Sequence, residues 1–437
     1  MATESSPSPR KQRIVFTAVG SLGDLHPLLA IALGMQARGH EALIATSECY
    51  RQKVKTLGLG FRAVRPDSDW VTDPNVMRRL MDPRMGLIRV VCERLLPVLR
   101  QSYEDTLAAA EGADLLVSHP ITYATRLVAE KTGIRWASTM SVPLGFFSAH
   151  DLSVFPLAPF LSKKLRFLGP VFWGPVFWMG ARATRFLAKP WYQLRAEIGL
   201  PPTRENNPLR DVHAPALVLA LFSKLLADKQ PDWPPQTVVT GFALFDQDSQ
   251  VGLPPALARF LEEGPPPLVF TLGTAVAMDA GPFYEHSAAA TKLLGRRAVL
   301  ILKDPRNRPA TLPDGVVAFD YAPFSELFPR AAALVHHGGI GTTGLALQSG
   351  RPMLIMPRAW DQPDNAQRAV RLGVARTIAR CRYTAPRVAA QLRQLLDNPV
   401  YAQRAFEVGE KVRQEDGVRA ACDALEALLQ PPRTVQN

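Results

Sequence analysis

Apolar and polar positions in the first third of the chain form a pattern that predicts alternating strands and helices. The apolar runs IVFTAVG, EALIATS and ADLLVSHP are each followed by helical spacing, at about residues 26–38, 49–57 and 123–132, and a further apolar run, RWASTMSVP, comes next. Strands that alternate with helices of about 10 to 15 residues are typical of βαβ units with a parallel sheet. We therefore predict a Rossmann-like unit over residues 13–142.

The same rhythm returns in the second half of the chain. Six apolar runs predict strands there: PLVFTLGT, RRAVLIL, GVVAFDYAP, AALVHHGG, PMLIMPR and VARTI. Residues 400–430 predict two helices without strands. Ligands of open parallel sheets bind beyond the carboxyl ends of the strands. Two such α/β units with facing sheets therefore predict a cleft that holds the chemistry.

Changes in composition divide the chain into five expected parts. The polar start lacks an apolar signal-peptide core and predicts a disordered leader over residues 1–12. The prolines of ADKQPDWPPQTVVTGFALFD predict a stiff linker over residues 229–240. The remaining parts are an N-terminal Rossmann-like domain (13–228), a C-terminal Rossmann-like domain (241–410) and a C-terminal helix (411–437) that packs back on the N-terminal domain.

Composition excludes several classes of protein. The four cysteines are widely spaced and include no C-x-x-C pair, so they indicate neither a disulfide framework nor a zinc site. The segment FLGPVFWGPVFWMGA is too short for a membrane span of about 20 residues. The net charge of +12 favours anionic partners, but the arginines are scattered and no nucleic-acid motif accompanies them. We expect a cytoplasmic protein that does not bind nucleic acid.

The stretch ALVHHGGIGTTGLAL (333–347) combines a buried strand, two histidines and a glycine-rich turn before a helix. Glycines let backbone N–H groups approach an anion, and a helix N-terminus offers free donors and about half a positive charge. A histidine and the two threonine hydroxyls add side-chain donors. The stretch therefore predicts a diphosphate site, although glycine-rich turns are often structural.

The longer segment YAPFSELFPRAAALVHHGGIGTTGLALQSGRPMLIMPRAWDQPDNAQR resembles the donor-binding signature of family 1 glycosyltransferases of the GT-B fold. The resemblance implies an enzyme that transfers a hexosyl group from a UDP- or dTDP-sugar, with inversion, to a hydroxyl of a small lipophilic acceptor such as a lipid, polyketide, flavonoid or sterol. PDWPPQTVVTGFALFD and PLVFTLGT are most similar to bacterial members typified by the catalytic chain of rhamnolipid rhamnosyltransferase.

The resemblance implies a role for each matching position of the donor site. His337 would contact the diphosphate of the donor. The Tyr321 ring and the Ala322 backbone would contact its nucleobase, and Asp361 and Gln362 would bind its sugar hydroxyls. The remaining donor-binding positions are Gly23, Gly273, Thr274, Gly339, Gly341, Thr342 and Thr343. Phe324 and Leu345 depart from the plant pattern, which has Gln and Glu there, so base and ribose recognition stay open. Tyr321 as plain core and Asp361 as a surface turn acid are the alternatives.

The first loop, GSLGDLHPLLA (20–30), would face the donor across the cleft. By resemblance Asp24 takes the position of the general base, with Asp24 as a helix N-cap as the alternative. His26 and His119 are further candidates for base or relay. Fixed dipoles can stabilise the leaving diphosphate, so we expect neither a metal nor a cofactor, and the triplets at 67–69 and 246–248 are not assigned to a metal.

Aromatic residues between 146 and 178 predict an apolar acceptor site, and Phe146, Phe147, Phe172 and Trp173 are its candidate residues. The basic excess near this region suggests peripheral contact with an anionic membrane. No obligate protein partner is evident. A nicotinamide enzyme is disfavoured because G-x-G-x-x-G does not follow the first strand. The alternative function is a non-catalytic accessory protein that binds a nucleotide sugar.

Overall fold

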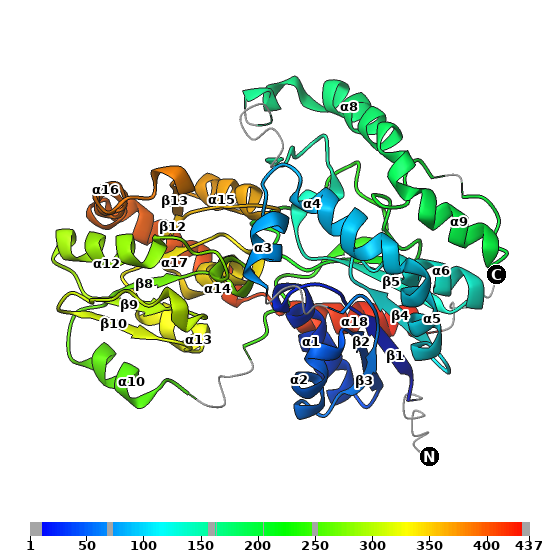
Figure 1. Ribbon diagram of the computed structural model, residues 1–437, viewed down its shortest axis with the longest axis horizontal. Helices are drawn as coiled ribbons and strands as arrows, with labels where there is room; N and C mark the ends of the chain where they lie inside the picture. Colours follow the sequence, from blue (N-terminus) through cyan, green and yellow to red (C-terminus); the bar gives the residue numbers. More distant parts are fainter. Residues whose placement is uncertain are drawn as a thin grey trace, which may run out of the picture.

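The computed structural model describes residues 11–67, 73–155, 162, 164–203, 205–246 and 252–430, so the expected leader lies almost entirely outside the described residues. Two parallel sheets dominate the fold, each covered by helices on both faces, and they lie side by side as two domains (Figure 1). The predicted α/β class with two Rossmann-like domains is confirmed.

The N-terminal sheet has the strand order β3-β2-β1-β4-β5-β6-β7. All of its neighbouring strands are parallel, and β1 lies between β2 and β4 with Ile14 opposite both Ala42 and Leu115. The strands are β1 (Arg13–Thr17), β2 (Glu41–Thr46), β3 (Gly60–Ala63), β4 (Leu115–Ser118), β5 (Arg135–Met140), β6 (Leu217–Ala220) and β7 (Thr237–Val239). Four of them, β1, β2, β4 and β5, coincide with the apolar runs of the sequence.

The C-terminal sheet has the order β10-β9-β8-β11-β12-β13 and is also parallel. All six of its strands were predicted from the sequence. They are β8 (Leu268–Thr271), β9 (Ala298–Ile301), β10 (Val316–Phe319), β11 (Ala333–His336), β12 (Met353–Ile355) and β13 (Ala375–Thr377). The central strands β8 and β11 are buried throughout, which explains their continuous apolar runs.

Helices link successive strands and cover the sheets. In the N-terminal domain they are α1 (Leu22–Ala37), α2 (Arg51–Thr56), α3 (Pro74–Leu80), α4 (Gly86–Arg89), α5 (Leu99–Ala109), α6 (Tyr123–Thr132), α8 (Gly169–Ala183) and α9 (Lys189–Glu197). In the C-terminal half they are α10 (Pro255–Glu262), α11 (Thr274–Ala277), α12 (Phe283–Leu294), α13 (Phe324–Leu327), α14 (Ile340–Ser349), α15 (Gln362–Arg371), α16 (Ala385–Asp397), α17 (Pro399–Arg413) and α18 (Gly417–Leu429).

Each sheet reverses its strand order at one point, between β1 and β4 in the first and between β8 and β11 in the second. The loops that leave these strands diverge to opposite faces and open a crevice at the carboxyl edge of the sheet. The residues predicted for catalysis and phosphate binding follow these four strands, so topology brings them to the two crevices.

The connections between the domains differ in one respect from the sequence prediction. The end of the predicted linker, Thr237–Val239, is strand β7, which pairs with β6 and belongs to the N-terminal sheet. The crossing into the C-terminal domain therefore follows β7. Helix α18 returns and lies against α1, where Cys422 and Val418 approach Gly34 so closely that a side chain there would overlap them (Figure 1).

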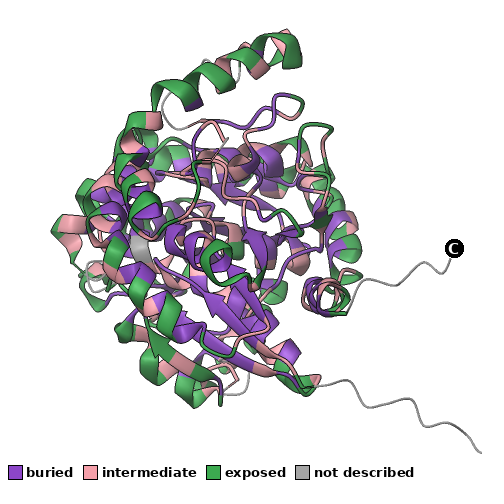
Figure 2. Cartoon of the chain, turned by 90° about the vertical axis from the view of Figure 1, so that its right-hand side faces the viewer, coloured by how far each residue is buried: buried purple, intermediate pink, exposed green. Residues whose placement is uncertain are grey.

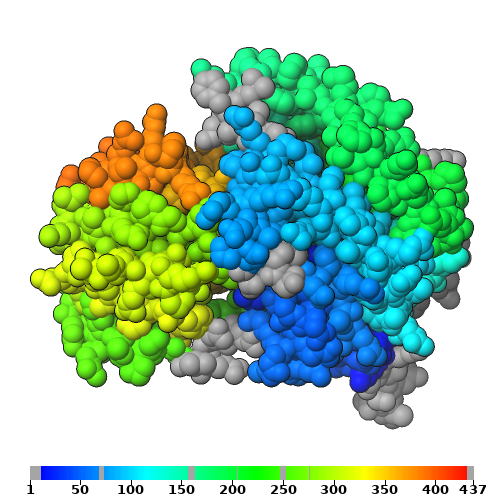
Figure 3. Space-filling model, viewed as in Figure 1, coloured from blue at the N-terminus to red at the C-terminus, as the bar shows by residue number. Residues whose placement is uncertain are grey.

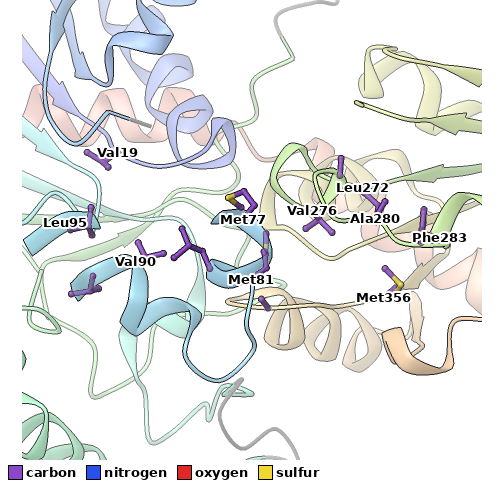
Figure 4. Close-up of a cluster of buried hydrophobic side chains, with 14 of the residues drawn as sticks. Val19, Met77, Met81, Val90, Leu95, Leu272, Val276, Ala280, Phe283 and Met356 are labelled. Atoms are coloured by element: carbon purple, nitrogen blue, oxygen red, sulfur yellow. The ribbon is translucent and has the colours of Figure 1, made fainter. Parts of the chain in front are cut away.

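Buried side chains fill the space between helices and sheets and also continue from one domain into the other. Figure 2 shows buried strands at the centre of the molecule. One cluster contains Met77 and Met81 from the N-terminal domain together with Leu272, Val276 and Met356 from the C-terminal domain (Figure 4). In the space-filling view the light-blue part that holds α3 and α4 lies against the C-terminal domain (Figure 3).

Helix α8 stands at the top of the molecule in Figures 1 and 2 and is largely exposed. Its exposed apolar side chains, with those of the adjoining turns, include Phe167, Val171, Phe172, Trp178, Met179 and Phe186. Among the described residues we find no helix with the length and apolar character needed to span a bilayer.

Candidate active site

Asp24 lies in the first turn of α1, just beyond the carboxyl end of β1. One of its carboxylate oxygens, Oδ2, accepts hydrogen bonds from the backbone N–H of Ser21 (2.8 Å) and from the Ser21 hydroxyl (3.0 Å). Gly20 has a φ of +118°, and a Cβ there would lie 2.5 Å from the same oxygen. The strand-to-helix turn therefore needs glycine at 20, because the carboxylate folds back over it. The capping role of Asp24 leaves Oδ1 available for other contacts.

His119 follows β4 directly and faces Asp24 from the other side of the sheet's reversal point. Its Nε2 lies 3.4 Å from Oδ1 of Asp24, and the exposed fractions of the two side chains are 7% and 37%. Burial alone would raise the pKa of Asp24, but the hydrogen bonds and charge supplied by His119 and Ser21 hold it below its ordinary value. The result is an ionised, partly exposed carboxylate beside a buried histidine.

His337 directly follows β11 and is held in one tautomer. Its Nδ1 accepts a hydrogen bond of 3.0 Å from the backbone N–H of Gly273, so its Nε2 carries the proton. Burial lowers the pKa of His337 to about 4, which keeps the ring neutral. A Cβ on Gly273 would lie 2.6 Å from the ring, and one on Gly339 would overlap it. The two glycines thus make the space for a neutral N–H donor.

Helix α14 begins immediately after this ring, with Gly339 at its N-cap. Glycine offers no capping side chain, so the first backbone N–H groups of the helix are left for an incoming acceptor. Gly341 is exposed, Thr342 is half-buried and Thr343 is buried. The Thr343 hydroxyl has no hydrogen-bond partner among the described residues. Backbone donors, a hydroxyl and the His337 N–H therefore gather at one helix end, which suits an anion.

Asp361 is the N-cap residue of α15, on the loop that leaves β12. Asn365 links this carboxylate to the phosphate loop, because its amide donates both to Asp361 Oδ2 (2.5 Å) and to the Gly338 carbonyl (3.0 Å). Burial raises the pKa of Asp361 to about 7, and the negative charge of Asp24 contributes to the increase. The two predicted acids, one from each domain, are therefore close enough to repel each other across the cleft.

Comparison with known proteins agrees with this geometry. Residues 14–134 match the glycosyltransferase family 28 N-terminal domain, and residues 295–425 match the C-terminal domain of erythromycin biosynthesis protein CIII-like proteins. The chain is 32% identical over 430 residues to O-mycaminosyltylonolide 6-deoxyallosyltransferase of Streptomyces fradiae, with 95% of this chain and 97% of the relative covered. The chain belongs to the GT-B glycosyltransferases.

Two further matches place this glycosyltransferase among its relatives. Sterol 3-beta-glucosyltransferase of Candida albicans is 26% identical over 446 residues, which are 99% of this chain but 29% of that protein. A solved structure of a Streptomyces glycosyltransferase complexed with thymidine diphosphate has a TM-score of 0.62 at 20% identity and covers 95% of this chain and 99% of its own. The finer likeness to rhamnolipid rhamnosyltransferase stays a prediction.

The predicted nucleobase site of the glycosyltransferase lies at the carboxyl ends of β9 and β10. Tyr321 is half-buried and Ala322 is buried. The ammonium group of Lys303 lies 4.7 Å from the centroid of the Tyr321 ring and 5.0 Å from that of Phe324. Sequence reasoning missed Lys303, which immediately follows the strand run RRAVLIL. The stacking role of Tyr321 stays a prediction.

Two further predicted donor-site residues, Gln362 and Thr274, lie at the starts of helices. The side-chain carbonyl of Gln362 accepts hydrogen bonds from the backbone N–H groups of Arg358 (2.9 Å) and Ala359 (3.2 Å), which leaves its amide N–H donors for other contacts. Thr274 begins the short helix α11 behind Gly273. Trp360, which precedes Asp361, and Asn365, in the first turn of α15, were not singled out from the sequence. The four-residue spacing of Asp361 and Asn365 at the start of a helix was the available signal.

The predicted acceptor residues occupy different surroundings. Both ring faces of Phe146 are covered, by Trp233 at 3.8 Å and by His213 at 5.3 Å between ring centroids. Trp173, a residue of α8, is buried, and its indole N–H donates to the Leu165 carbonyl (3.0 Å). Phe147 stacks on Phe155 at 5.8 Å, and the exposed fraction of Phe172 is 43%. Phe147 and Phe172 are thus more accessible than the other two, and the acceptor assignment stays a prediction for all four.

The role of His26 as base or relay stays a prediction. It lies two residues beyond Asp24 on α1, and its ring contacts Phe245 with 5.0 Å between centroids. Within the described part of the chain, no group of three His, Cys, Asp or Glu side chains could hold a metal ion. Ser68 and Asp69 of the first acidic triplet, and Gln247 and Asp248 of the second, lie outside the described residues.

Proposed function

We propose that this glycosyltransferase moves a hexosyl group from a UDP- or dTDP-sugar to a hydroxyl of a small lipophilic acceptor, with inversion at the anomeric carbon. The observation that carries the proposal is the approach of Asp24 from one domain to Asp361 from the other, which Asn365 links to the loop after His337. A base and an anion site on opposite walls of one cleft suit direct displacement. The thymidine diphosphate in the related structure supports the donor class.

The reaction is a single displacement in this proposal. The acceptor oxygen forms a bond to the anomeric carbon on the face opposite the diphosphate, and the bond from that carbon to the phosphate oxygen breaks. Asp24 takes the proton of the acceptor hydroxyl. The diphosphate leaves with the electron pair and is stabilised by the Nε2–H of His337, the hydroxyls of Thr342 and Thr343, and the N-terminus of α14.

Asp24 is favoured over His119 as the base because it is the more exposed of the pair. His119 then has a positioning role, since its hydrogen bond fixes Oδ1 of Asp24 and stabilises its charge. A carboxylate of low pKa is a weak base toward an alcohol, so its assistance grows as the bond to the anomeric carbon forms. Asp361 accepts hydrogen bonds from the sugar and orients the anomeric carbon toward Asp24.

The test is transfer by the purified chain, followed by mass spectrometry with UDP- and dTDP-sugars against macrolide aglycones, sterols and hydroxy lipids. The proposal expects a product with inverted anomeric configuration and a loss of about 10²- to 10⁴-fold in Asp24→Asn. His119→Asn should lose less. A chain that binds a nucleotide sugar but transfers and hydrolyses nothing would instead be an accessory protein. Absence of affinity for every nucleoside diphosphate would overturn the proposal.

The acceptor class is supported from two directions. The relatives named above act on a macrolide and on sterols, which are bulky and apolar. In this chain Phe177 of α8 forms an aromatic cluster with Phe147 and Phe155, and the ring centroids of Phe147 and Phe177 are 6.3 Å apart. Aromatic rings of this kind bind extended apolar ligands.

We also propose that α8 brings the enzyme to an anionic membrane surface. Val171, Trp178, Met179 and Phe186 are spaced along one face of the helix and its continuation, and their exposed fractions range from 55% to 88%. No Asp or Glu occurs between residues 164 and 196, whereas Arg182 and Lys189 are exposed. Exposed aromatic residues combined with positive charge are typical of interfacial helices.

Sedimentation with vesicles tests the membrane proposal. The chain should bind phosphatidylglycerol vesicles more strongly than phosphatidylcholine vesicles, and the difference should shrink with salt. Trp178→Ala and Arg182→Glu should each weaken binding about tenfold, whereas Phe406→Ala, at an exposed site on α17, should not. Equal affinity for both lipids, or self-association that these substitutions abolish, would overturn it.

A further inference from the structure

Trp360 adopts a backbone conformation that residues with a side chain rarely occupy. Its φ is +56°, in the left-handed region that favours glycine. It stands between Ala359, which is fully buried, and Asp361, the N-cap of α15. A strained conformation of this kind persists where surrounding contacts hold it in place. The contacts of its indole ring identify what holds it.

The indole group of Trp360 reaches the opposite domain. Its Nε1–H donates a hydrogen bond of 3.2 Å to the carbonyl of Leu80, the last residue of α3. Gly86, at the start of α4, makes room for this contact, because a Cβ there would overlap the Leu80 carbonyl and lie 3.3 Å from the indole nitrogen. The chain between α3 and α4 is therefore shaped as an acceptor site for the indole of Trp360.

Other contacts hold α3 against the C-terminal domain around this hydrogen bond. Met77 and Met81 are buried in the cluster that includes Val276 and Met356, as Figure 4 shows. Arg78 lies 3.6 Å from Asp279, which is also paired with Arg358 of the loop that carries Trp360. The contacts around α3 thus join the two domains, and they include Trp360, the residue before Asp361.

We propose that Trp360 is a positioning residue that couples closure of the two domains to the placement of Asp361 on the donor sugar. The inference rests on the proposed function. When the domains close, the hydrogen bond to Leu80 holds residue 360 in its strained conformation and directs Asp361 toward the cleft. When they separate, the indole loses its partner and the backbone before Asp361 relaxes. The diphosphate site lies on β11 and α14 and does not depend on this hydrogen bond.

Three substitutions separate the parts of this coupling. Trp360→Phe keeps an aromatic ring and removes the N–H donor. Trp360→Gly removes the ring and accepts a positive φ without strain. Gly86→Ala disturbs the acceptor from the other domain and leaves residue 360 intact. Phe406→Leu is the control, because Phe406 is exposed and lies beside Gly350 at the carboxyl end of α14, away from the cleft.

Steady-state kinetics with a nucleotide sugar and an acceptor provide the readout, together with the ratio of donor hydrolysis to transfer. We expect kcat to fall about 3- to 10-fold in Trp360→Phe, as for the loss of one hydrogen bond, and further in Trp360→Gly and Gly86→Ala. The calorimetric Kd for the nucleoside diphosphate, which lacks the sugar that Asp361 contacts in the proposed function, should stay within about twofold of wild type. Hydrolysis should gain on transfer, because an open cleft admits water.

The outcomes are distinguishable. If the wild-type chain transfers no sugar, the proposed function fails. If it transfers sugar and Trp360→Phe has wild-type kcat and hydrolysis ratio, the coupling is overturned. An equal loss of diphosphate affinity in all three variants would also overturn it, because that result indicates a general disturbance of the C-terminal domain. Phe406→Leu should match wild type in every measurement.

Discussion

At the scale of single residues, the ionisation of Asp361 links function to stability. Burial raises the pKa of this carboxyl to about 7 from an ordinary value of 3.8. The protonated form is therefore favoured by folding, and the associated stability is full below about pH 4 and is lost as the pH rises through 7. In the proposed function the same group accepts hydrogen bonds from sugar hydroxyls, and a carboxylate accepts them more strongly than a neutral carboxyl group does. The proposed role of Asp361 would thus retain a negative charge that makes the free protein less stable.

Asp361→Asn tests this conflict. The variant should gain melting temperature relative to wild type at pH 8 but not at pH 4, because the amide needs no ionisation. Its transfer rate should fall about 10- to 100-fold, which corresponds to the 1.5–3 kcal/mol of a hydrogen bond to a charged group. Asp314→Asn, at an exposed position, is the control. Equal changes in melting temperature at both pH values would contradict the prediction.

At the scale of elements, the start of α14 depends on how closely glycine lets the chain approach the His337 ring. The ring is positioned from β8 by the Gly273 N–H, and its other nitrogen is left as a donor. The sequence predicted a phosphate site at the glycine-rich turn from residue types alone. It did not reveal that Gly273, 64 residues earlier, sets the tautomer, because the pairing of β8 with β11 brings the two together.

His337→Ala and Gly339→Ala should therefore have similar effects. The first removes the donor, and the second displaces the ring that carries it. Calorimetry should give a Kd for the nucleoside diphosphate about 10- to 100-fold weaker in each, as for the loss of a hydrogen bond to an anion. Gly341→Ala should be milder, because a Cβ there meets no atom within 4 Å. Wild-type affinity in Gly339→Ala would contradict the steric argument.

At the scale of the whole molecule, α15 is held from the N-terminal domain at two places. Just before the start of α15, Trp360 contacts the last residue of α3. Further along, buried Arg368 pairs with Asp364 (2.7 Å) and with Asp151 of the N-terminal domain, and Arg371 lies 3.0 Å from Asp151. The backbone N–H of Val154 donates to Asp364 (2.8 Å). Removal of one partner from such a buried network leaves the other charge uncompensated, so this boundary depends on every member of the network.

Asp151→Asn should weaken this boundary. Burial would raise the pKa of Asp151, but Arg368 and Arg371 lower it below its ordinary value. Its contribution is therefore present above about pH 4 and is lost as the pH falls further. We expect the variant to lose roughly 1–3 kcal/mol in the free energy of unfolding at pH 7, less than a fully orphaned charge because Asp364 remains. Urea denaturation at pH 7 and pH 3 should show the difference shrinking in acid; a constant difference would contradict it.

The pattern of apolar runs was sufficient to predict ten of the strands, because buried parallel strands are apolar on both faces. It missed β3, which is largely exposed, and it missed β6 and β7. The prolines around β7 are typical of a linker, but its backbone pairs with β6. Strand pairing depends on neighbours that lie far away in the sequence, so local composition misplaced this segment.

The amino-acid sequence by itself determined the α/β class, the two domains and the loops that follow β1, β4, β8 and β11, because each of these depends on residue types within a short segment. Only the tertiary structure decided which atoms meet. It brought His119 to Asp24, Gly273 to His337 and the Leu80 carbonyl to Trp360. Such contacts join residues separated by 64 to 280 positions, and they follow from strand order and domain packing, which no local pattern contains.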